Sequence, residues 1–351
     1  MTGTFMIYGA TGYTGKLAAR RAKADGLAPV LAGRSAARLQ PLAAELSLAW
    51  RAIDLADAAA LDAGLADIDV VLHTAGPFSQ TSRPMLDACL RTGTHYLDIT
   101  GEIDVFEACA ARDDEALRAG IMVMPGVGFD VVPSDCLAAH MKTLLPDATE
   151  LTLAIGGLGH MSRGTAKTGI EGIGRPTRLR RAGTIVESRA PLRREIDFGD
   201  GPKCAVAVGW GDVSTAFHST GIPDITVYFE AAPQLEHMAE LGPVGRWVLS
   251  RGPVQAWLKR WADRQPEGPT DAQREAGRGE LIGEAVNAAG ETRRARLRTP
   301  EGYSLTALTG LEIARRVMAG AAVPGFQTPS RVFGADFILG FPGCARHDLN
   351  A

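Results

Sequence analysis

The chain has 351 residues, of which 46% are hydrophobic and 22% charged, and its formal net charge at pH 7 is -3. This length allows two domains with sizeable cores, and the weak overall charge gives no global reason to expect nucleic acid or an anionic membrane surface as a partner. The five cysteines show no metal-ligand spacing, no signal peptide is recognised, and no apolar run reaches the roughly 18 residues of a membrane span. We therefore expect a cytoplasmic protein without a metal, a disulfide framework or a membrane span.

The first 130 residues alternate short apolar strands with amphipathic helices. Strands are predicted at 5–8, 29–32, up to about 53, 70–73, 95–99 and 121–124, and helices at 16–25, 36–46, 57–65, 83–92 and 105–119. Continuous apolar strands between helices are typical of a parallel, doubly wound sheet. The predicted fold class is therefore α/β, beginning with a Rossmann-type domain.

After Pro133 the pattern changes. Segments 150–155 and 222–230 alternate like half-buried strands, and 281–287 with 292–297 form a predicted hairpin. These segments indicate a second, mixed and largely antiparallel sheet. A last helix is predicted at 304–318, with apolar residues spaced for burial on one face, and a Gly- and Pro-rich tail follows it.

A glycine-rich loop lies between the first strand and the first helix. It reads GATGYTG at 9–15, so its glycines recur every third residue. In such a unit, glycines allow a tight turn and the close approach of a pyrophosphate, which the N-terminus of the helix then binds. The alternative is a turn that merely starts a helix. We predict cofactor binding by Gly9, Ala10, Thr11, Gly12, Tyr13, Thr14 and Gly15.

The end of the second strand distinguishes the two nicotinamide cofactors. An acidic residue there would bind the ribose 2′-hydroxyl of NAD, whereas arginine accommodates the 2′-phosphate of NADP. The sequence has Arg34 and Ser35, with Arg38 one turn later and no carboxylate in the tip. A guanidinium matches a phosphate in charge and geometry, so NADP is favoured. The alternative reading of Arg34 is an exposed loop arginine.

Two further strand ends are expected to complete the cofactor site. Ligands of open α/β sheets lie beyond the carboxyl ends of the strands. Asp54 and Leu55 follow the third strand and are expected beside the adenine. The segment after the fourth strand is small enough for a ribose and a nicotinamide to approach its backbone, and it comprises Thr74, Ala75, Gly76, Pro77 and Phe78.

Together these segments resemble a known family. The motifs GATGYTG, AGRS, TAGPF, HYLDITGE and PGVGFDVVPSD, followed by SRGTAKT, the stretch 210–228 and GYSLTALTGLEIARR, occur in this order in saccharopine dehydrogenase-like oxidoreductases. The chain is most similar to the branch that includes trans-acting enoyl reductases. The resemblance implies an NADP-binding Rossmann domain, with a mixed α/β domain inserted before a C-terminal segment that returns to it. We therefore expect one domain at 1–130 plus about 302–351, and a substrate and oligomerisation domain at 131–301.

The proton donor of a reductase is less evident. None of the five tyrosines is followed by lysine four residues later, so the Tyr-x-x-x-Lys pair of short-chain dehydrogenases is missing. Asp130, after a parallel strand, is a candidate acid or substrate acceptor, although capping of a helix near Ser134 is the favoured reading. Asp212 and His218 are further candidates in a predicted Gly- and Ser-rich loop. An isolated histidine, however, is more often a structural hydrogen-bonding group.

Two other segments allow a structural and a functional reading. The run 175–194 has seven arginines, namely Arg175, Arg178, Arg180, Arg181, Arg189, Arg193 and Arg194. A solvated face is favoured, and a clamp for a phosphate- or carboxylate-bearing substrate, such as a carrier-bound acyl thioester, is the alternative. Segment 238–262 has three tryptophans and is predicted to form two short amphipathic helices. Packing onto the sheet is favoured over a lipophilic entrance or peripheral membrane contact.

These observations favour an NADP-dependent reductase that acts on a C=C, C=N or C=O bond of a small-molecule, lipid-like or acyl substrate. The alternative is a non-catalytic, NADP-binding sensor that controls a partner. The large second domain favours the enzyme, because a sensor needs no separate substrate chamber. We also expect a homo-oligomer, specifically a homodimer.

Overall fold

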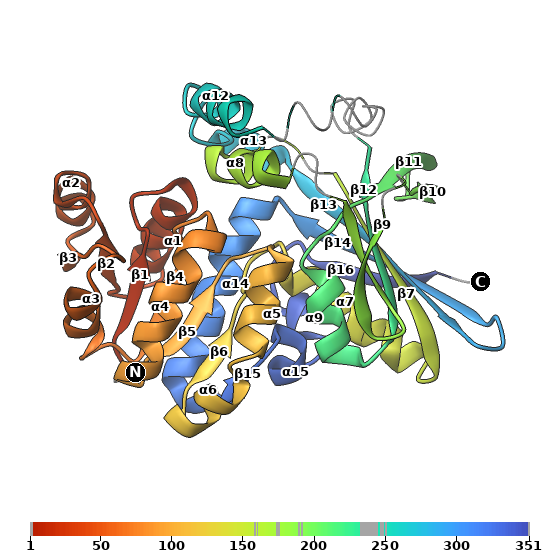
Figure 1. Cartoon of the computed structure of the whole chain (residues 1–351), viewed down its shortest axis with the longest axis horizontal. Coiled ribbons are helices and arrows are strands. Elements are labelled where there is room, and N and C mark those ends of the chain that lie inside the picture. The colour runs from red at the N-terminus through yellow and green to blue at the C-terminus, as the bar shows by residue number, and fades with distance from the viewer. Residues whose placement is uncertain are drawn as a thin grey trace. The chain divides into compact units, whose positions relative to one another are not determined.

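The computed structural model describes residues 3–157, 159, 161–172, 176–188, 190, 192–231, 245, 249 and 251–349. Its contacts divide the chain into two compact units (Figure 1). Unit 1 comprises Met1–Val132 and Tyr303–Phe333, and unit 2 comprises Pro133–Gly302 and Gly334–Ala351. Each unit is built around its own sheet. Among the described residues, no helix is long and apolar enough to cross a membrane.

Unit 1 contains a seven-stranded parallel sheet in the order β15-β6-β5-β4-β1-β2-β3. Its strands are β1 (Phe5–Tyr8), β2 (Val30–Gly33), β3 (Trp50–Ala52), β4 (Val70–His73), β5 (His95–Asp98), β6 (Met122–Met124) and β15 (Gly325–Phe326). The order 3-2-1-4-5-6 is that of the Rossmann fold, in which the order of strand addition reverses between β1 and β4. The predicted α/β class and Rossmann-type sheet are confirmed.

Helices connect these strands. They are α1 (Tyr13–Ala24), α2 (Ala36–Leu46), α3 (Ala58–Leu65), α4 (Phe78–Thr92), α5 (Ile103–Ala110), α6 (Asp113–Ala119), α14 (Gly302–Arg316) and α15 (Pro329–Phe333). The single helix predicted at 105–119 is two helices, because the chain turns at Ala111 and Arg112. The helix predicted at 83–92 begins five residues earlier, at Phe78.

The core of unit 1 lies on both faces of its sheet. On one face, Val71 of β4 belongs to a buried cluster with residues of α3, α4, α5 and α6. The next residue, Leu72, points to the opposite face because side chains alternate along a strand. There α14 approaches closely, since a Cβ added to Gly310 would lie 3.3 Å from Leu72. The C-terminal helix is thus part of the core of unit 1.

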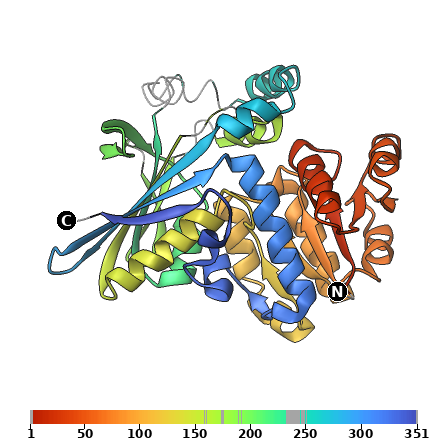
Figure 2. The same cartoon turned by 180° about the vertical axis from the view of Figure 1, so that it is seen from behind.

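Unit 2 contains a mixed sheet in the order β10-β11-β12-β7-β13-β14-β16, and β8 and β9 extend it beside β12. Its strands are β7 (Ala148–Gly156), β8 (Thr177–Arg181), β9 (Thr184–Ser188), β10 (Arg193–Asp197), β11 (Pro202–Ala207), β12 (Asp224–Glu230), β13 (Arg278–Asn287), β14 (Thr292–Pro300) and β16 (Ala345–Leu349). Only the β7–β12 pair is parallel among these described strands. The predicted hairpin is β13–β14, shown in blue in Figure 2.

The helices of unit 2 within the described residues are α7 (Val132–Leu144), α8 (Arg163–Gly172), α9 (Asp212–Thr220), α12 (Gly252–Ala262) and α13 (Asp271–Ala276). Helix α7 packs closely on the sheet, because a Cβ added to Gly283 of β13 would lie 2.9 Å from Met141. It begins at Val132, two residues before the predicted start.

The C-terminal segment divides between the two units. Tyr303–Phe333 belongs to unit 1, whereas Gly334–Ala351 belongs to unit 2. There β16 pairs with β14, so that Arg296 lies opposite His347. His140 of α7 and Asp348 of β16 are 2.6 Å apart. The roles expected for the two units, cofactor binding and substrate binding, stay predictions.

Candidate functional site

The three glycines of the loop between β1 and α1 meet different constraints. Gly9 has φ +87°, and a Cβ there would lie 2.7 Å from the backbone nitrogen of Ala75. A Cβ at Gly15 would overlap the carbonyl oxygen of Gly9. Gly12 differs, because among the described residues, its chain neighbours aside, only the Gly9 oxygen lies within 4 Å of its added Cβ, at 3.3 Å. Folding thus requires Gly9 and Gly15, whereas Gly12 leaves space for a ligand, as in dinucleotide-binding loops.

The N-terminus of α1 suits a phosphate. Its N-cap, Gly12, is extended at φ -76° and ψ 169° and offers no side chain, and its first turn contains no acidic residue. The backbone N–H groups and the positive end of the helix dipole therefore face the loop without a competing carboxylate. The amides of Gly9 and Ala10 donate to the carbonyl oxygen of Ala32, at 2.8 and 3.1 Å, and hold the loop beside β2.

The basic tip after β2 lies against this loop. Arg34 is exposed, and Ser35 is the half-buried N-cap of α2. The Nη2 of Arg38 donates to the carbonyl oxygen of Thr11 at 3.0 Å. The sequence identified Arg38 as part of a tip without carboxylates but did not place it at the loop. In the sequence, this contact could have been suspected only from the position of Arg38, which lies four residues after Arg34 in the first turn of α2.

Asp54 and Leu55, expected beside the adenine, follow β3 at the carboxyl edge of the sheet. Asp54 is exposed, and its Oδ1 accepts from the amide of Ala56 at 3.0 Å. Next to them the hydroxyl of Tyr8 donates to the carbonyl oxygen of Ile53 at 2.9 Å. Burial, followed by the Asp54 charge, raises the pKa of Tyr8 to about 12, and the Arg34 charge opposes this rise. Asp54 and Arg34 thus lie close enough to act on one phenol.

The loop after β4, formed by Thr74–Phe78, is held by its own hydrogen bonds. The amide and the hydroxyl of Thr74 both donate to the Tyr8 carbonyl oxygen, at 2.8 and 2.9 Å. Thr81 Oγ1 donates to the carbonyl oxygens of Ala75 and Pro77, at 2.6 and 3.1 Å. This loop therefore presents a fixed backbone at the edge where the nicotinamide end was predicted.

Two acidic residues of the HYLDITGE motif support the same edge, and the sequence did not single them out. Glu102 Oε1 and Oε2 accept from the amides of Phe78 and Ser79, at 2.9 and 2.8 Å, and so satisfy the start of α4. Asp98 is fully buried and accepts from Tyr96 Oη, at 2.5 Å, among other groups. Burial raises the pKa of Asp98 to about 6. The sequence feature that could have identified Asp98 is a carboxylate at the end of an apolar strand.

Asp130 lies in the loop after β6, which α14 supports. Thr306 Oγ1 accepts from the amide of Phe129 at 2.9 Å, and Thr309 Oγ1 donates to the carbonyl oxygen of Val127 at 2.7 Å. Burial raises the pKa of Asp130 to about 7. The carboxyl group can therefore hold or release a proton near neutral pH.

Asp212 and His218 were predicted to lie in a loop. In the structure they lie in helix α9. Asp212 is buried in its first turn, and His218 is half-buried in its last turn beside Phe217. Six residues of α-helix separate two side chains by about 9 Å along the axis and about 240° around it. The two therefore do not converge on one reacting group. The helix forms because Val213 and its neighbours are buried, and Gly221 ends it at φ +68°. Both belong to unit 2, and Asp130 to unit 1.

Within the arginine run, three side chains have structural partners. Arg180 is buried, donates through Nε to Val213 O at 2.8 Å, and lies 4.1 Å from the centre of the Phe217 ring. Arg181 donates to Thr226 Oγ1 at 2.8 Å. The Arg194 guanidinium lies 2.7 Å from a Glu284 oxygen. The predicted solvated face is therefore wrong for Arg180, which is buried, and all three arginines have partners within the protein. Arg175 and Arg189 lie outside the described residues.

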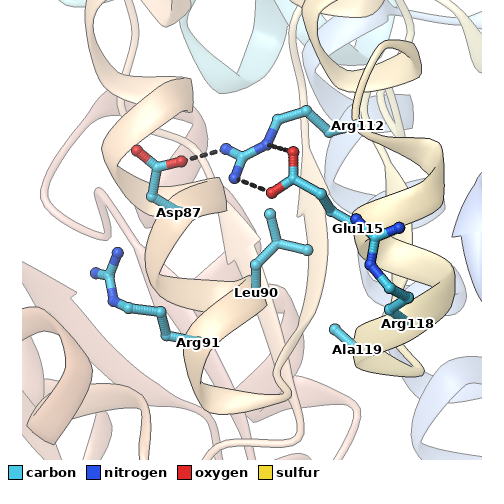
Figure 3. A pocket seen from close by; sticks show the side chains of 7 residues that line it. All are labelled: Asp87, Leu90, Arg91, Arg112, Glu115, Arg118 and Ala119. Carbon is cyan, nitrogen blue, oxygen red and sulfur yellow. Dashed lines mark hydrogen bonds and ion pairs between the residues drawn. The ribbon is translucent and has the colours of Figure 1, made fainter.

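A hollow of about 420 Å³ lies between the second half of α4 and α6, and Figure 3 shows its lining. The guanidinium of Arg112 joins Asp87 of α4 to Glu115 of α6 across one end of it. None of its lining residues belongs to the predicted cofactor or proton-donor set.

Comparison with known proteins fits this geometry. Residues 5–124 match the family described as the saccharopine dehydrogenase NADP binding domain. The chain is 38% identical to the trans-acting enoyl reductase of Mycobacterium leprae over 138 residues, which cover 37% of this chain and 33% of that protein. It is 34% identical to the protein of the same name from Mycobacterium ulcerans over 152 residues, 39% and 34% of the two chains. The chain thus matches about a third of the length of these curated relatives.

The fold also matches a solved structure. Apo saccharopine dehydrogenase (L-Glu forming) from Saccharomyces cerevisiae has a TM-score of 0.65 and 13% identity, and the match covers 99% of this chain and 100% of that one. At this identity the likeness concerns the fold, and it agrees with the two-sheet α/β architecture. The family match confirms the predicted resemblance and the choice of NADP for the domain at 5–124.

Proposed function

We propose that this chain, whose residues 5–124 belong to the saccharopine dehydrogenase NADP binding domain family, is an NADP-dependent oxidoreductase. In this proposal it reduces a C=C, C=N or C=O bond of a small-molecule, lipid-like or acyl substrate. The observation that carries the proposal is the contrast among the loop glycines. Gly9 and Gly15 are required by packing, whereas Gly12 is open beside an N-terminus of α1 that no acidic residue occupies.

The residues around the loop have distinct expected roles. Gly12 and the N-terminus of α1 would receive the pyrophosphate. Arg34, Ser35 and Arg38 would surround the 2′-phosphate, because guanidinium groups bind phosphate by charge and geometry. Asp54 and Leu55 would lie beside the adenine, and the loop Thr74–Phe78 beside the ribose and nicotinamide. When bound, NADPH supplies the hydride.

Asp130 is the strongest candidate for proton delivery. Its pKa of about 7 means that a substantial fraction of the carboxyl groups carries a proton at neutral pH. The backbone of the loop that bears it is held beyond the end of β6 by Thr306 and Thr309 of α14, which supports this role. Asp212 and His218 stay candidates for contact with the substrate.

The experiment has two stages. NADPH and NADH are titrated by fluorescence against the purified chain, with Gly12→Val as the control. NADPH consumption is then followed with α,β-unsaturated thioesters, ketones and imines in parallel. Turnover of one class supports the reductase and identifies the bond. Tight NADPH binding without turnover of any class would favour the alternative, a non-catalytic NADP sensor. If the unmodified chain neither binds NADPH nor turns over any of these substrates, the proposal is contradicted.

We further propose that the protein is a homodimer in the cytoplasm. Analytical ultracentrifugation over a range of concentrations tests the first part, and fractionation of cells expressing the full chain tests the second. A monomer at all concentrations would contradict the homodimer.

A further inference from the structure

Helix α12 exposes its most hydrophobic side chains. Trp257 and Trp261, one turn apart, are 64% and 53% exposed, whereas Ala262 is buried and Leu258 is half-buried. With Met161, which is 66% exposed two residues before α8, they are the three most exposed large hydrophobic side chains of the described residues. An amphipathic helix that only covered a core would bury its indoles. The exposed tryptophans therefore indicate a surface that binds an apolar partner.

The orientation of α12 is fixed by contacts with α8. Lys167 Nζ and Asp263 Oδ1 are 2.6 Å apart, and Gln255 Nε2 donates to the carbonyl oxygen of Ile170 at 3.3 Å. At the far end, the amide of Arg163 donates to the carbonyl oxygen of Glu267 at 3.1 Å. These contacts hold opposite ends of the helix and direct one side of it toward α8. The tryptophans therefore stay on the outer side while the two helices remain paired.

Positive charges accompany the tryptophans. Arg260 follows Trp257 by three residues, so it lies on the tryptophan side of the helix. Arg264 follows Trp261 by three residues, in the turn just after the helix ends at Ala262, where its amide donates to the carbonyl oxygen of Trp261. Both arginines are exposed. The neighbouring carboxylate, Asp263, is held by Lys167. The outer face of α12, which we define as Trp257, Arg260, Trp261 and Arg264, therefore combines two indoles with two cations.

We propose that this outer face of α12 docks on the surface of a membrane that contains anionic phospholipids. Indole rings favour the boundary between headgroups and acyl chains, and arginine is attracted to the negative surface potential of anionic lipids. A second copy of the chain is a poor occupant, because a two-fold interface joins the same patch of both copies and would gather the arginines of both in one interface. The lipid surface supplies both the apolar layer and the opposite charge. Such a contact lies along the membrane and does not cross it.

Vesicle flotation with the full chain tests this proposal. We expect binding to vesicles of phosphatidylcholine with phosphatidylglycerol, and at least ten-fold weaker binding to phosphatidylcholine alone. The double variant Trp257→Ser/Trp261→Ser should lose at least ten-fold in partitioning. The variant Arg260→Gln/Arg264→Gln should lose the preference for anionic vesicles. The matched control is Trp50→Ser, since Trp50 is also exposed, at 38%, but lies on β3 of unit 1.

Circular dichroism and the thermal unfolding transition check that the α12 variants fold, because α12 belongs to unit 2 and the proposed cofactor site to unit 1. Vesicles with brominated acyl chains provide a measurement without mutation, since they should quench tryptophan fluorescence of the unmodified chain. Equal binding to neutral and anionic vesicles, unchanged binding in the tryptophan variant, or absence of quenching would overturn the proposal. Concentration-dependent dimerisation that disappears in the tryptophan variant would also overturn it, because the occupant would then be a second copy.

Discussion

The carboxylate of Asp98, at the end of β5, accepts a hydrogen bond from the backbone amide of Gly126, which follows β6, at 2.9 Å. The same Oδ1 also accepts from the amide of Thr100, and the carbonyl oxygen of Asp98 accepts from Val127. One buried residue thus joins the ends of two neighbouring parallel strands. The loop that leads to Asp130 takes its conformation from this contact, so part of the candidate site depends on a residue that need not touch a ligand.

Replacing Asp98 should therefore destabilise unit 1. Asp98→Ala leaves the Tyr96 hydroxyl and two backbone amides buried without acceptors, and we expect a loss of about 3 kcal/mol in the free energy of unfolding. Urea denaturation measures it. Asp98→Asn retains an acceptor oxygen and should lose less than half as much. Equal losses in the two variants would show that the charge, and not the hydrogen bonding, stabilises these strand ends.

The loop glycines provide a second prediction that separates binding from folding. Gly12→Val should fold and lose affinity for both NADPH and NADH, because its side chain would occupy the open space proposed for the pyrophosphate. Gly15→Val should fail to fold, since even its Cβ would overlap the Gly9 carbonyl oxygen. Circular dichroism and cofactor titration distinguish the two outcomes. A folded Gly15→Val variant, or a Gly12→Val variant that binds NADPH normally, would contradict this interpretation of the loop.

The two arginines of the tip should affect cofactor binding differently. We expect NADPH to bind at least ten-fold more tightly than NADH, or about 1.4 kcal/mol. Arg34→Ala should remove most of this difference and leave NADH affinity unchanged. Arg38→Ala should weaken both cofactors, because Arg38 also holds the glycine-rich loop through Thr11. Calorimetric titration of the two variants with both cofactors measures this. An NADH preference, or selectivity that survives Arg34→Ala, would refute the assignment of the 2′-phosphate site.

His73 provides a prediction about stability and pH. The imidazole is buried near the rings of Tyr8, Phe78 and Tyr96, and this burial lowers the pKa of His73 from 6.5 to about 3. Between these values the unfolded chain binds the additional proton. The stabilisation by neutral imidazole is therefore complete above pH 6.5 and declines as the pH falls, by at most about 1.4 kcal/mol per pH unit.

The variant His73→Phe should lack this decline. Asp98 and Asp130, whose pKa values are raised, act in the opposite direction, but they are present in both proteins and cancel in the difference. Urea denaturation from pH 7.5 to 4.5 should show the variant gaining stability relative to the unmodified chain below pH 6.5. A difference that does not change with pH would mean that the imidazole is accessible to protons in the folded state.

The sequence was sufficient for the parallel sheet and the glycine loop, because both depend on local patterns. Apolar strands such as Val70–His73 are continuous in the sequence, and the glycine spacing follows from the turn itself. The start of α4 was placed too late because the groups that satisfy it belong to Glu102, 24 and 23 residues away. Strand β16 was missed because its sequence, ARHDL, is polar and its partner is β14.

Parts of the candidate site depended on contacts between distant residues in the same way. Gly and Ser around α9 suggested a loop, yet burial of Val213 and the contacts of Arg180 stabilise a helix there. The bond from Arg38 to Thr11 spans 27 residues and leaves only a weak local signal. The local sequence shows which residue types follow a predicted strand. It does not predict which of them a distant segment will hold in place.

Asp130 gives the most direct test of the proposed chemistry. If its protonated carboxyl group delivers the proton that accompanies hydride transfer, kcat/KM for the substrate should fall above about pH 7, the pKa to which burial raises this group. Asp130→Asn should lose about a hundred-fold or more in kcat/KM and show a flat profile over the same range, because the amide has no proton to deliver. NADPH affinity should be unchanged, which separates loss of proton transfer from loss of cofactor. Asp114→Asn, an exposed position on α6, is the matched control and should keep the profile of the unmodified chain. Retention of the pH dependence in Asp130→Asn would assign the proton to another group, and Asp212 and His218 would then be the next residues to replace.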